Sequence, residues 1–342
     1  MEVETLLKEM IRREASDLHL TADASAFLRV DGKLEPQDCV TKAALDRWLA
    51  DVLPRAAGTG RSVGDGIDFS LTTDGRRLRG NAYRTEGTMA VALRLLPERI
   101  PTLCDIGAPP SVAALAQATQ GAIFAVGRTG AGKSTTLAAL LLALAEARTR
   151  AGTGLHCITL EDPIEFRYRA AGCLFHQREF GRDFSSFAAA IRDALREDPD
   201  VLLVSELRDR ETIRAALAAA EAGTLVLSTL HARTAAEAPQ RLSDFFPAGD
   251  RAGIRASLAA SLTAVVAQRL VPAAAGGRHA VFEVLLRTPA ICRMIHDGDD
   301  AQIASAMLAG ARQGMTTFAQ EGRRLMAQGV ISRDVIERWE ER

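Results

Sequence analysis

The sequence predicts an α/β protein in which a small α+β domain precedes a parallel sheet flanked by helices, with further helices at the C-terminus. Three features support this fold class. Strand-like and helical stretches fill the N-terminal part, apolar strands alternate with Ala- and Leu-rich helices after residue 112, and a cluster of prolines separates the two parts. The expected domains are 1–97, a linker at 98–111, a core at 112–271 and a mainly helical region at 272–342.

The N-terminal domain is expected to begin with an amphipathic helix, because Leu6, Leu7, Met10 and Ile11 recur at helical spacing. Short apolar stretches then predict strands, and the Gly-containing pairs between them predict tight turns. The expected strands lie around 18–20 and 27–30 and at 67–72, 77–84 and 89–96, with a helix at 42–52 and turns at Asp31-Gly32, Asp74-Gly75 and Glu86-Gly87.

The core alternates short apolar runs with longer stretches rich in Ala and Leu, which is the pattern of a parallel sheet with helices on both faces. The strands are expected at 122–126, 157–160, 201–204, 224–228 and, in the C-terminal region, 280–286, and the helices are expected from about Ser134 and at 187–196 and 211–222.

Composition excludes several classes of protein. Of the 342 residues, 47% are hydrophobic and 25% are charged, so the chain can bury a large core and is not disordered or fibrous. The net charge of −1 and the 5% of aromatic residues argue against a nucleic-acid-binding protein. Five scattered cysteines, with no C-x-x-C pair, argue against a disulfide framework and indicate a reducing compartment.

Nothing in the chain predicts membrane insertion. Met1–Glu14 lacks the apolar segment of a signal peptide, and the longest apolar run, Leu137–Ala145, is about half as long as a membrane span. The expected location is the cytoplasm, with any membrane contact peripheral.

A phosphate-binding loop is the strongest local signal. Residues 127–134 fit G-x-x-x-x-G-K-[ST] between a predicted strand and a predicted helix. Such a loop wraps backbone amides around phosphates at a helix N-terminus. Lys133, one of only four lysines beside 38 arginines, can bind the β- and γ-phosphates, and the Ser134 hydroxyl can ligate Mg²⁺. The expected cofactor-binding residues are Gly127, Thr129, Gly130, Ala131, Gly132, Lys133, Ser134 and Thr135.

Acidic and histidine side chains follow three of the predicted strands. Glu206 follows the apolar strand 201–204, at the sheet edge where the phosphate loop also lies, and is our candidate for the catalytic base. Glu161, Asp162 and Glu165 follow strand 157–160, and their spacing alone does not decide which of them faces the nucleotide. His231 follows strand 224–228 and is a candidate sensor of the γ-phosphate.

These four motifs together resemble the secretion-type ATPases of type IV pilus and type II secretion machines. Their order matches that family's Walker A loop, aspartate box, atypical Walker B and histidine box. The likeness covers nearly the whole chain and is greatest to the PilT-like, twitching-motility branch that retracts pili. Further similar stretches are Ser16–Leu20, Gln177–Glu179, Leu195–Asp200, Glu206–Thr212 and Gln313–Phe318.

The resemblance implies a PAS-like N-terminal domain joined to a RecA-like ATPase domain, assembled as a homohexamer that hydrolyses ATP with Mg²⁺. It assigns the main catalytic role to Glu206 and a supporting one to Glu165 rather than Glu161. It also implies that Arg79 and Arg94 of the small domain approach the γ-phosphate. The implied partners are the cytoplasmic part of an inner-membrane platform protein and a paralogous ATPase, with no nucleic acid.

Several positions depart from the family pattern. Ser205 stands where the family usually has Gly, Arg128 where it usually has Pro, and Ala232-Arg233-Thr234 follows His231. Ser205 and the altered residues after His231 leave room for a second interpretation, a non-hydrolysing or accessory P-loop subunit that modulates a paralogous pilus or secretion ATPase. A type II or type IV secretion ATPase and a RecA-like DNA motor are two further hypotheses.

Overall fold

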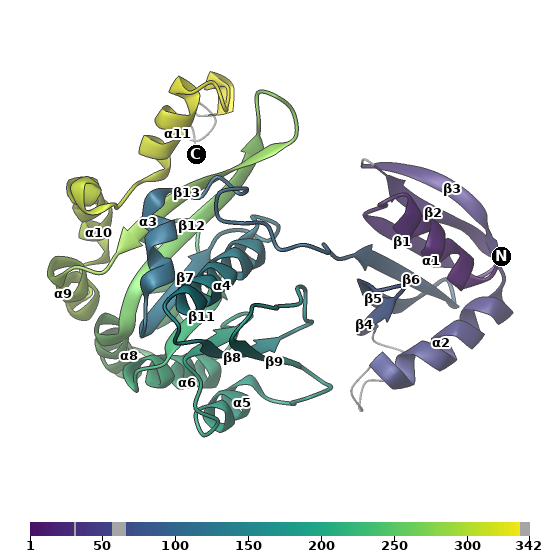
Figure 1. The fold of residues 1–342 in the computed structure, drawn as a ribbon, viewed down its shortest axis with the longest axis horizontal. Helices are drawn as coiled ribbons and strands as arrows, with labels where there is room; N and C mark the ends of the chain where they lie inside the picture. Colours follow the sequence, from purple (N-terminus) through teal and green to yellow (C-terminus); the bar gives the residue numbers. More distant parts are fainter. Residues whose placement is uncertain (31, 57–65, 336–342) are drawn as a thin grey trace. The chain divides into compact units, whose positions relative to one another are not determined.

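The computed structural model describes residues 1–30, 32–56 and 66–335, so the turn expected at Asp31-Gly32 lies partly outside the described residues. Contacts divide the chain into two compact units (Figure 1). The small unit comprises Met1–Arg99 together with two later stretches, Glu161–Arg167 and Arg178–Ser185. The large unit comprises Ile100–Leu160, Tyr168–Gln177 and Ser186–Arg342.

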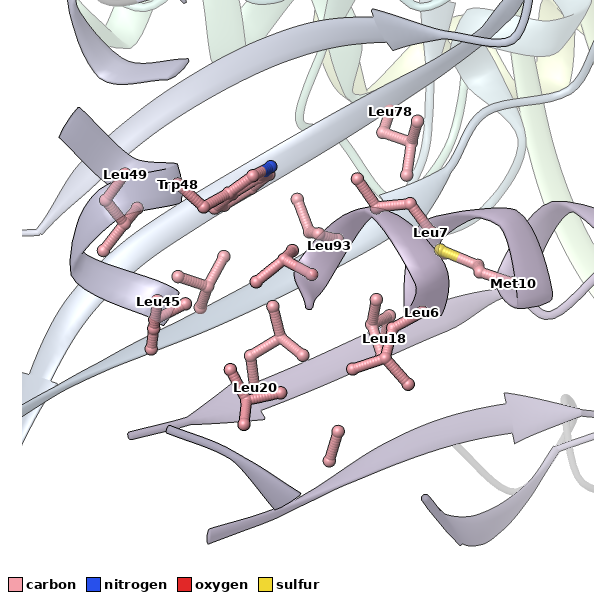
Figure 2. Close-up of a cluster of buried hydrophobic side chains, with 14 of the residues drawn as sticks. Leu6, Leu7, Met10, Leu18, Leu20, Leu45, Trp48, Leu49, Leu78 and Leu93 are labelled. Carbon is pink, nitrogen blue, oxygen red and sulfur yellow. The ribbon is translucent and has the colours of Figure 1, made fainter. Parts of the chain in front are cut away.

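The small unit is an antiparallel six-stranded sheet in the order β3-β2-β1-β6-β5-β4, packed against two helices. Its elements are α1 (Val3–Arg12), β1 (Asp17–Thr21), β2 (Ala24–Val30), β3 (Lys33–Val40), α2 (Lys42–Ala56), β4 (Ile67–Thr73), β5 (Arg76–Thr85) and β6 (Thr88–Leu95). Leucines of α1, β1, β5 and β6 meet Trp48 of α2 in one buried core (Figure 2). The helical spacing of Leu6, Leu7 and Met10 is explained by this core, because all three side chains are buried in it.

Two hairpin turns of this sheet are those that the sequence predicts. Asp74 and Gly75 connect β4 to β5 with φ of 46° and 75°, and Glu86 and Gly87 connect β5 to β6 with φ of 48° and 78°. Positive φ at both central residues is the geometry of the two-residue turn that matches the twist of paired strands.

The large unit contains a seven-stranded sheet in the order β13-β12-β7-β11-β10-β8-β9. Strands β12, β7, β11, β10 and β8 run parallel, whereas β13 pairs antiparallel with β12. Helices α4 and α6 both contact the central strands β7 and β11. The strands are β7 (Gly121–Val126), β8 (Leu155–Glu161), β9 (Cys173–Glu179), β10 (Val201–Val204), β11 (Leu225–Leu230), β12 (Leu262–Pro272) and β13 (Arg278–Leu286).

Helices connect these strands and follow them to the C-terminus (Figure 1). They are α3 (Pro110–Ala114), α4 (Lys133–Arg150), α5 (Phe187–Ala194), α6 (Arg210–Glu221), α7 (Ala238–Asp244), α8 (Ala248–Ser261), α9 (Pro289–Asp297), α10 (Asp300–Ala309) and α11 (Phe318–Ala327). The predicted class, an α/β protein with a parallel-containing sheet, an N-terminal sheet domain and C-terminal helices, is confirmed. Strands β3, β9 and β12 are additions that the sequence did not predict. Within the described ranges, no helix is long and apolar enough to cross a bilayer.

Candidate nucleotide site

The phosphate loop joins the end of the central strand β7 at Val126 to the start of α4 at Lys133. Its three glycines have positive φ, at 149° for Gly127, 77° for Gly130 and 90° for Gly132. Gly132 is the N-cap residue of α4, so the amides of the first turn of this helix are available to an anion. The loop sequence therefore produces the backbone that phosphate binding requires.

Gln268 of β12 supports this loop, although sequence reasoning did not identify it. A Cβ at Gly127 would come within 2.6 Å of the Gln268 carbonyl oxygen, and a Cβ at Gly132 within 2.7 Å of its side-chain nitrogen. The buried Gln268 side chain also accepts a hydrogen bond of 2.5 Å from Thr136 Oγ1 in the first turn of α4. Only glycine fits against this support at either position.

Lys133 is the first residue of α4, and its side chain is buried against the loop. Its Nζ donates hydrogen bonds to the carbonyl oxygens of Gly127 at 2.9 Å and Arg128 at 3.1 Å. Burial lowers the pKa of Lys133, and the nearby charge of Glu206 opposes this effect. The ammonium is thus held inside the loop, while Ser134, the next residue, is exposed.

Glu206 and His231 come together although separate strands carry them. Strands β10 and β11 are parallel and in register, with Val204 opposite Ser228, so the residues that follow both strands meet at one edge of the sheet. His231 Nε2 lies 2.9 Å from Glu206 Oε1. The other oxygen, Oε2, accepts a hydrogen bond of 2.8 Å from Arg208 Nε. The carboxylate is therefore oriented from both sides.

A buried glutamate anchors the segment that follows His231. Glu283 of β13 accepts hydrogen bonds from the amide of Ala235 at 2.7 Å and from the amide of Phe318, at the start of α11, at 3.1 Å. Burial raises the pKa of Glu283, and these two bonds work against that rise. The Glu283 carboxylate thus links the segment that follows His231 to the start of α11.

A cavity of about 520 Å³ opens beside the phosphate loop in the large unit. Its lining includes Arg128 of the loop, His231, Arg233 and, from α7, Arg241. Two of these arginines, Arg128 and Arg233, are departures from the expected family pattern, and the lining also contains the acidic Glu237 and Asp244, so the cavity carries charges of both signs.

Three other predicted site residues belong to the small unit. Arg79 of β5 lies directly opposite Arg94 of β6 in the sheet register. Arg94 Nε donates a hydrogen bond of 2.9 Å to Asp17, and its side chain is 69% exposed. Glu165 lies in the stretch Glu161–Arg167, and its amide bonds to Glu161 Oε2 at 3.4 Å. That these three residues act on a nucleotide stays a prediction.

The large unit therefore combines a glycine-rich phosphate loop, a buried lysine and a glutamate–histidine pair at the ends of parallel strands. The class of protein that this fold and site define is a P-loop ATPase. The chain belongs to the family described as Type II/IV secretion system protein, whose model matches residues 2–341.

Individual relatives align with nearly the whole chain. It is 40% identical over 333 residues to the uncharacterized protein YggR of Escherichia coli, covering 96% of this chain and 99% of that protein. It is 38% identical over 340 residues to the type IV pilus retractation ATPase PilT of Pseudomonas aeruginosa, covering 98% and 96%. A crystal structure of the pilus retraction motor PilT with bound ADP aligns with a TM-score of 0.85, at 34% identity, covering 99% and 96%.

The role of Gln268 can be tested by removing its side chain. The Gln268→Ala substitution is expected to raise the dissociation constant for ADP about tenfold, because Thr136 at the start of α4 loses its hydrogen bond to β12 and the side chain that packs beside Gly132 is removed, so the loop is held less firmly. Titration calorimetry on the purified chain measures this. Gln302→Ala, at an exposed position of α10, is the matched control, and equal affinities for the two variants would contradict the role.

Proposed function

We propose that this chain is an ATP-hydrolysing motor subunit that powers type IV pilus retraction and twitching motility as a homohexamer. The observation that carries the proposal is the Glu206–His231 pair, which belongs to the same unit as the buried Lys133 of the phosphate loop. The full-length similarity to a pilus retraction ATPase supports the choice of machine.

The loop residues fit ATP with Mg²⁺. Gly130 has open space around it, and the first turn of α4 follows Gly132 directly, so phosphate oxygens can approach the amides closely. Thr129, Ala131 and Thr135 complete the proposed binding segment. Within the described part of the chain, no cluster of three or more His, Cys, Asp or Glu side chains could hold a metal. The residues of the loop motif indicate that Mg²⁺ would be held by the Ser134 hydroxyl together with phosphate oxygens.

The proposed mechanism assigns one task to each side chain. Lys133 binds the terminal phosphates through its ammonium group, and bound Mg²⁺ supplies further neutralisation of phosphate charge. Glu206 accepts a hydrogen bond from the attacking water, because each carboxylate oxygen has a second lone pair beyond those used by His231 and Arg208. His231 keeps the carboxylate oriented. Glu165, Arg79 and Arg94 assist from the small unit, and the arginines stabilise transition-state charge when the units close.

The proposed partners follow from a motor role. Closure of one subunit is passed to the next around a ring, and the ring delivers this motion to the cytoplasmic part of an inner-membrane platform protein. A paralogous ATPase can share the same ring or platform. The proposed location is the cytoplasmic side of the inner membrane.

The experiment that tests the proposal compares three strains of the organism that carries the chain: wild type, a deletion, and a deletion complemented with Lys133→Ala. Pilus retraction is followed by fluorescence microscopy, and the mass of the purified chain is measured by light scattering with and without ATP. We expect retraction to be lost in both mutant strains and a hexameric mass with ATP. Normal retraction in both mutant strains would instead support the accessory role, and loss of pilus assembly would support an extension or secretion motor.

A further inference from the structure

A buried polar cluster, which we call the clasp, joins β4 and β5 to two later stretches of the chain within the small unit. Its side chains are Ser70, Arg77 and Glu179, and its backbone group is that of Ile164. The Arg77 guanidinium forms an ion pair with Glu179, and the two side chains are only 10% and 6% exposed. The sequence separation between the two charges is 102 residues.

Five hydrogen bonds connect the members of the clasp. Arg77 Nε donates to the Ile164 carbonyl oxygen at 2.8 Å, and Arg77 Nη2 donates to Ser70 Oγ at 2.9 Å and to Glu179 Oε2. Glu179 Oε1 accepts from Ser70 Oγ at 2.5 Å, and Oε2 accepts from the Ile164 amide at 3.1 Å. Both backbone groups of Ile164 are thus held by opposite members of one ion pair.

The burial of the Arg77–Glu179 pair indicates that it fixes local geometry rather than adding stability. Charges are costly to remove from water, and a buried ion pair adds little stability compared with an apolar pair of the same size. Burial accordingly lowers the pKa of Arg77, against the opposing effect of Glu179. What such a pair does supply is geometry, because a planar guanidinium binds several acceptors in fixed directions.

The backbone that the clasp holds is the one that carries Glu165. Ile164 directly precedes Glu165, and the amide of Phe180 donates to the Glu161 carbonyl oxygen at 2.8 Å at the other end of the same stretch. Contacts accordingly group Glu161–Arg167 and Arg178–Ser185 with the small unit, although the surrounding sequence belongs to the large one.

We propose that Arg77 is a positioning residue that holds the Glu165 carboxylate in place by binding Ile164 and Glu179. This inference rests on the proposed function, in which Glu165 supports catalysis. Arg77 and Arg79 are alternate residues of β5, so they lie on the same face of the sheet. Glu165 therefore moves with the small unit and its arginines, and closure brings these groups to the nucleotide as one body.

The test is a double-mutant cycle on the full chain with Arg77→Lys and Glu165→Gln. Lysine keeps the positive charge beside Glu179 but has one nitrogen, which cannot bind Glu179 and the Ile164 carbonyl in the directions of a guanidinium. Arg77→Lys is expected to lower kcat for ATP hydrolysis about tenfold with KM changed less than about twofold. In the Glu165→Gln background, Arg77→Lys is expected to change kcat less than about twofold, because the carboxylate that Arg77 positions has already been replaced.

The matched control is Arg76→Lys, which changes the neighbouring residue of β5. Arg76 also forms a two-bond ion pair, with Glu14, but it does not contact Ile164 or Glu179. Amide exchange of the 161–167 stretch is expected to rise in Arg77→Lys and not in Arg76→Lys, whether or not the chain hydrolyses ATP.

The outcomes separate the two proposals. An equal loss of kcat in both backgrounds, an unchanged kcat in Arg77→Lys alone, or unchanged amide exchange would overturn the positioning role and leave the ATPase proposal intact. Absence of turnover in the wild-type hexamer would contradict the proposed function, while amide exchange would still decide whether Arg77 fixes the loop. An unchanged kcat in Glu165→Gln alone would overturn both the catalytic role of Glu165 and the positioning proposal.

Discussion

Replacing Lys133 by alanine is expected to abolish ATP turnover, with a fall in kcat/KM of at least about 100-fold. The ammonium is held inside the loop by the carbonyl oxygens of Gly127 and Arg128, and no other lysine follows it in the sequence. Alanine therefore removes the point charge that balances the developing charge on the terminal phosphates. Phosphate release from the purified chain, measured over a range of ATP concentrations at saturating Mg²⁺, gives kcat/KM.

Lys42→Ala is the matched control for this prediction. Lys42 forms an exposed ion pair with Asp46 within α2, so its loss is expected to change turnover less than about twofold. Turnover in Lys133→Ala at the level of this control would show that the loop does not bind the phosphates in the proposed way.

The second large effect is expected from Glu206→Gln, which should lower kcat by about 10² to 10³ while ADP still binds with an affinity close to that of the wild type. The amide has the shape of the carboxylate but is a much weaker proton acceptor, so water activation is lost. The loop around Lys133 and its support by Gln268 are not altered. Rapid-quench measurement of the chemical step, together with ADP titration, separates chemistry from binding.

This substitution also discriminates between a motor and a non-hydrolysing subunit. Failure of both the wild-type and the Glu206→Gln protein to release phosphate would favour a scaffold role. Glu211→Gln is the matched control, because it makes the same chemical change at an exposed position in the first turn of α6. A loss of turnover in the control as large as in Glu206→Gln would remove Glu206 from its catalytic role.

Serine at position 205, where the family pattern usually has glycine, does not disturb the site formed by Glu206 and His231. Ser205 is not among the residues with positive φ, so the side chain that replaces glycine brings no backbone strain. Its amide donates to the Leu160 carbonyl oxygen at 2.9 Å, and its carbonyl accepts from Thr229 Oγ1 at 2.6 Å. The neighbouring Glu206 reaches His231 regardless, which favours a hydrolysing subunit over a scaffold.

Local signals in the sequence were sufficient for most elements. The turns at Asp74-Gly75 and Glu86-Gly87 and the start of α4 depend on residues next to one another, so their chemistry can be read directly. Strand β12 could not be predicted in this way, because it follows α8 without a connecting loop, with Ser261 ending the helix and Leu262 beginning the strand. The apolar stretch inside this strand, Ala264–Ala267, is too short to have a periodicity that distinguishes a helix from a strand.

By itself, the sequence determined the phosphate loop, the parallel-containing sheet and the choice of Glu206 and His231 as separate candidates, because each depends on a contiguous stretch of residues. Only the tertiary structure decided that these two side chains lie 2.9 Å apart and that Gln268 supports the loop. The contact of Arg77 with Glu179 is likewise visible only in the tertiary structure. Such contacts join residues far apart in the chain, and strand order and register, which no single segment encodes, bring them together.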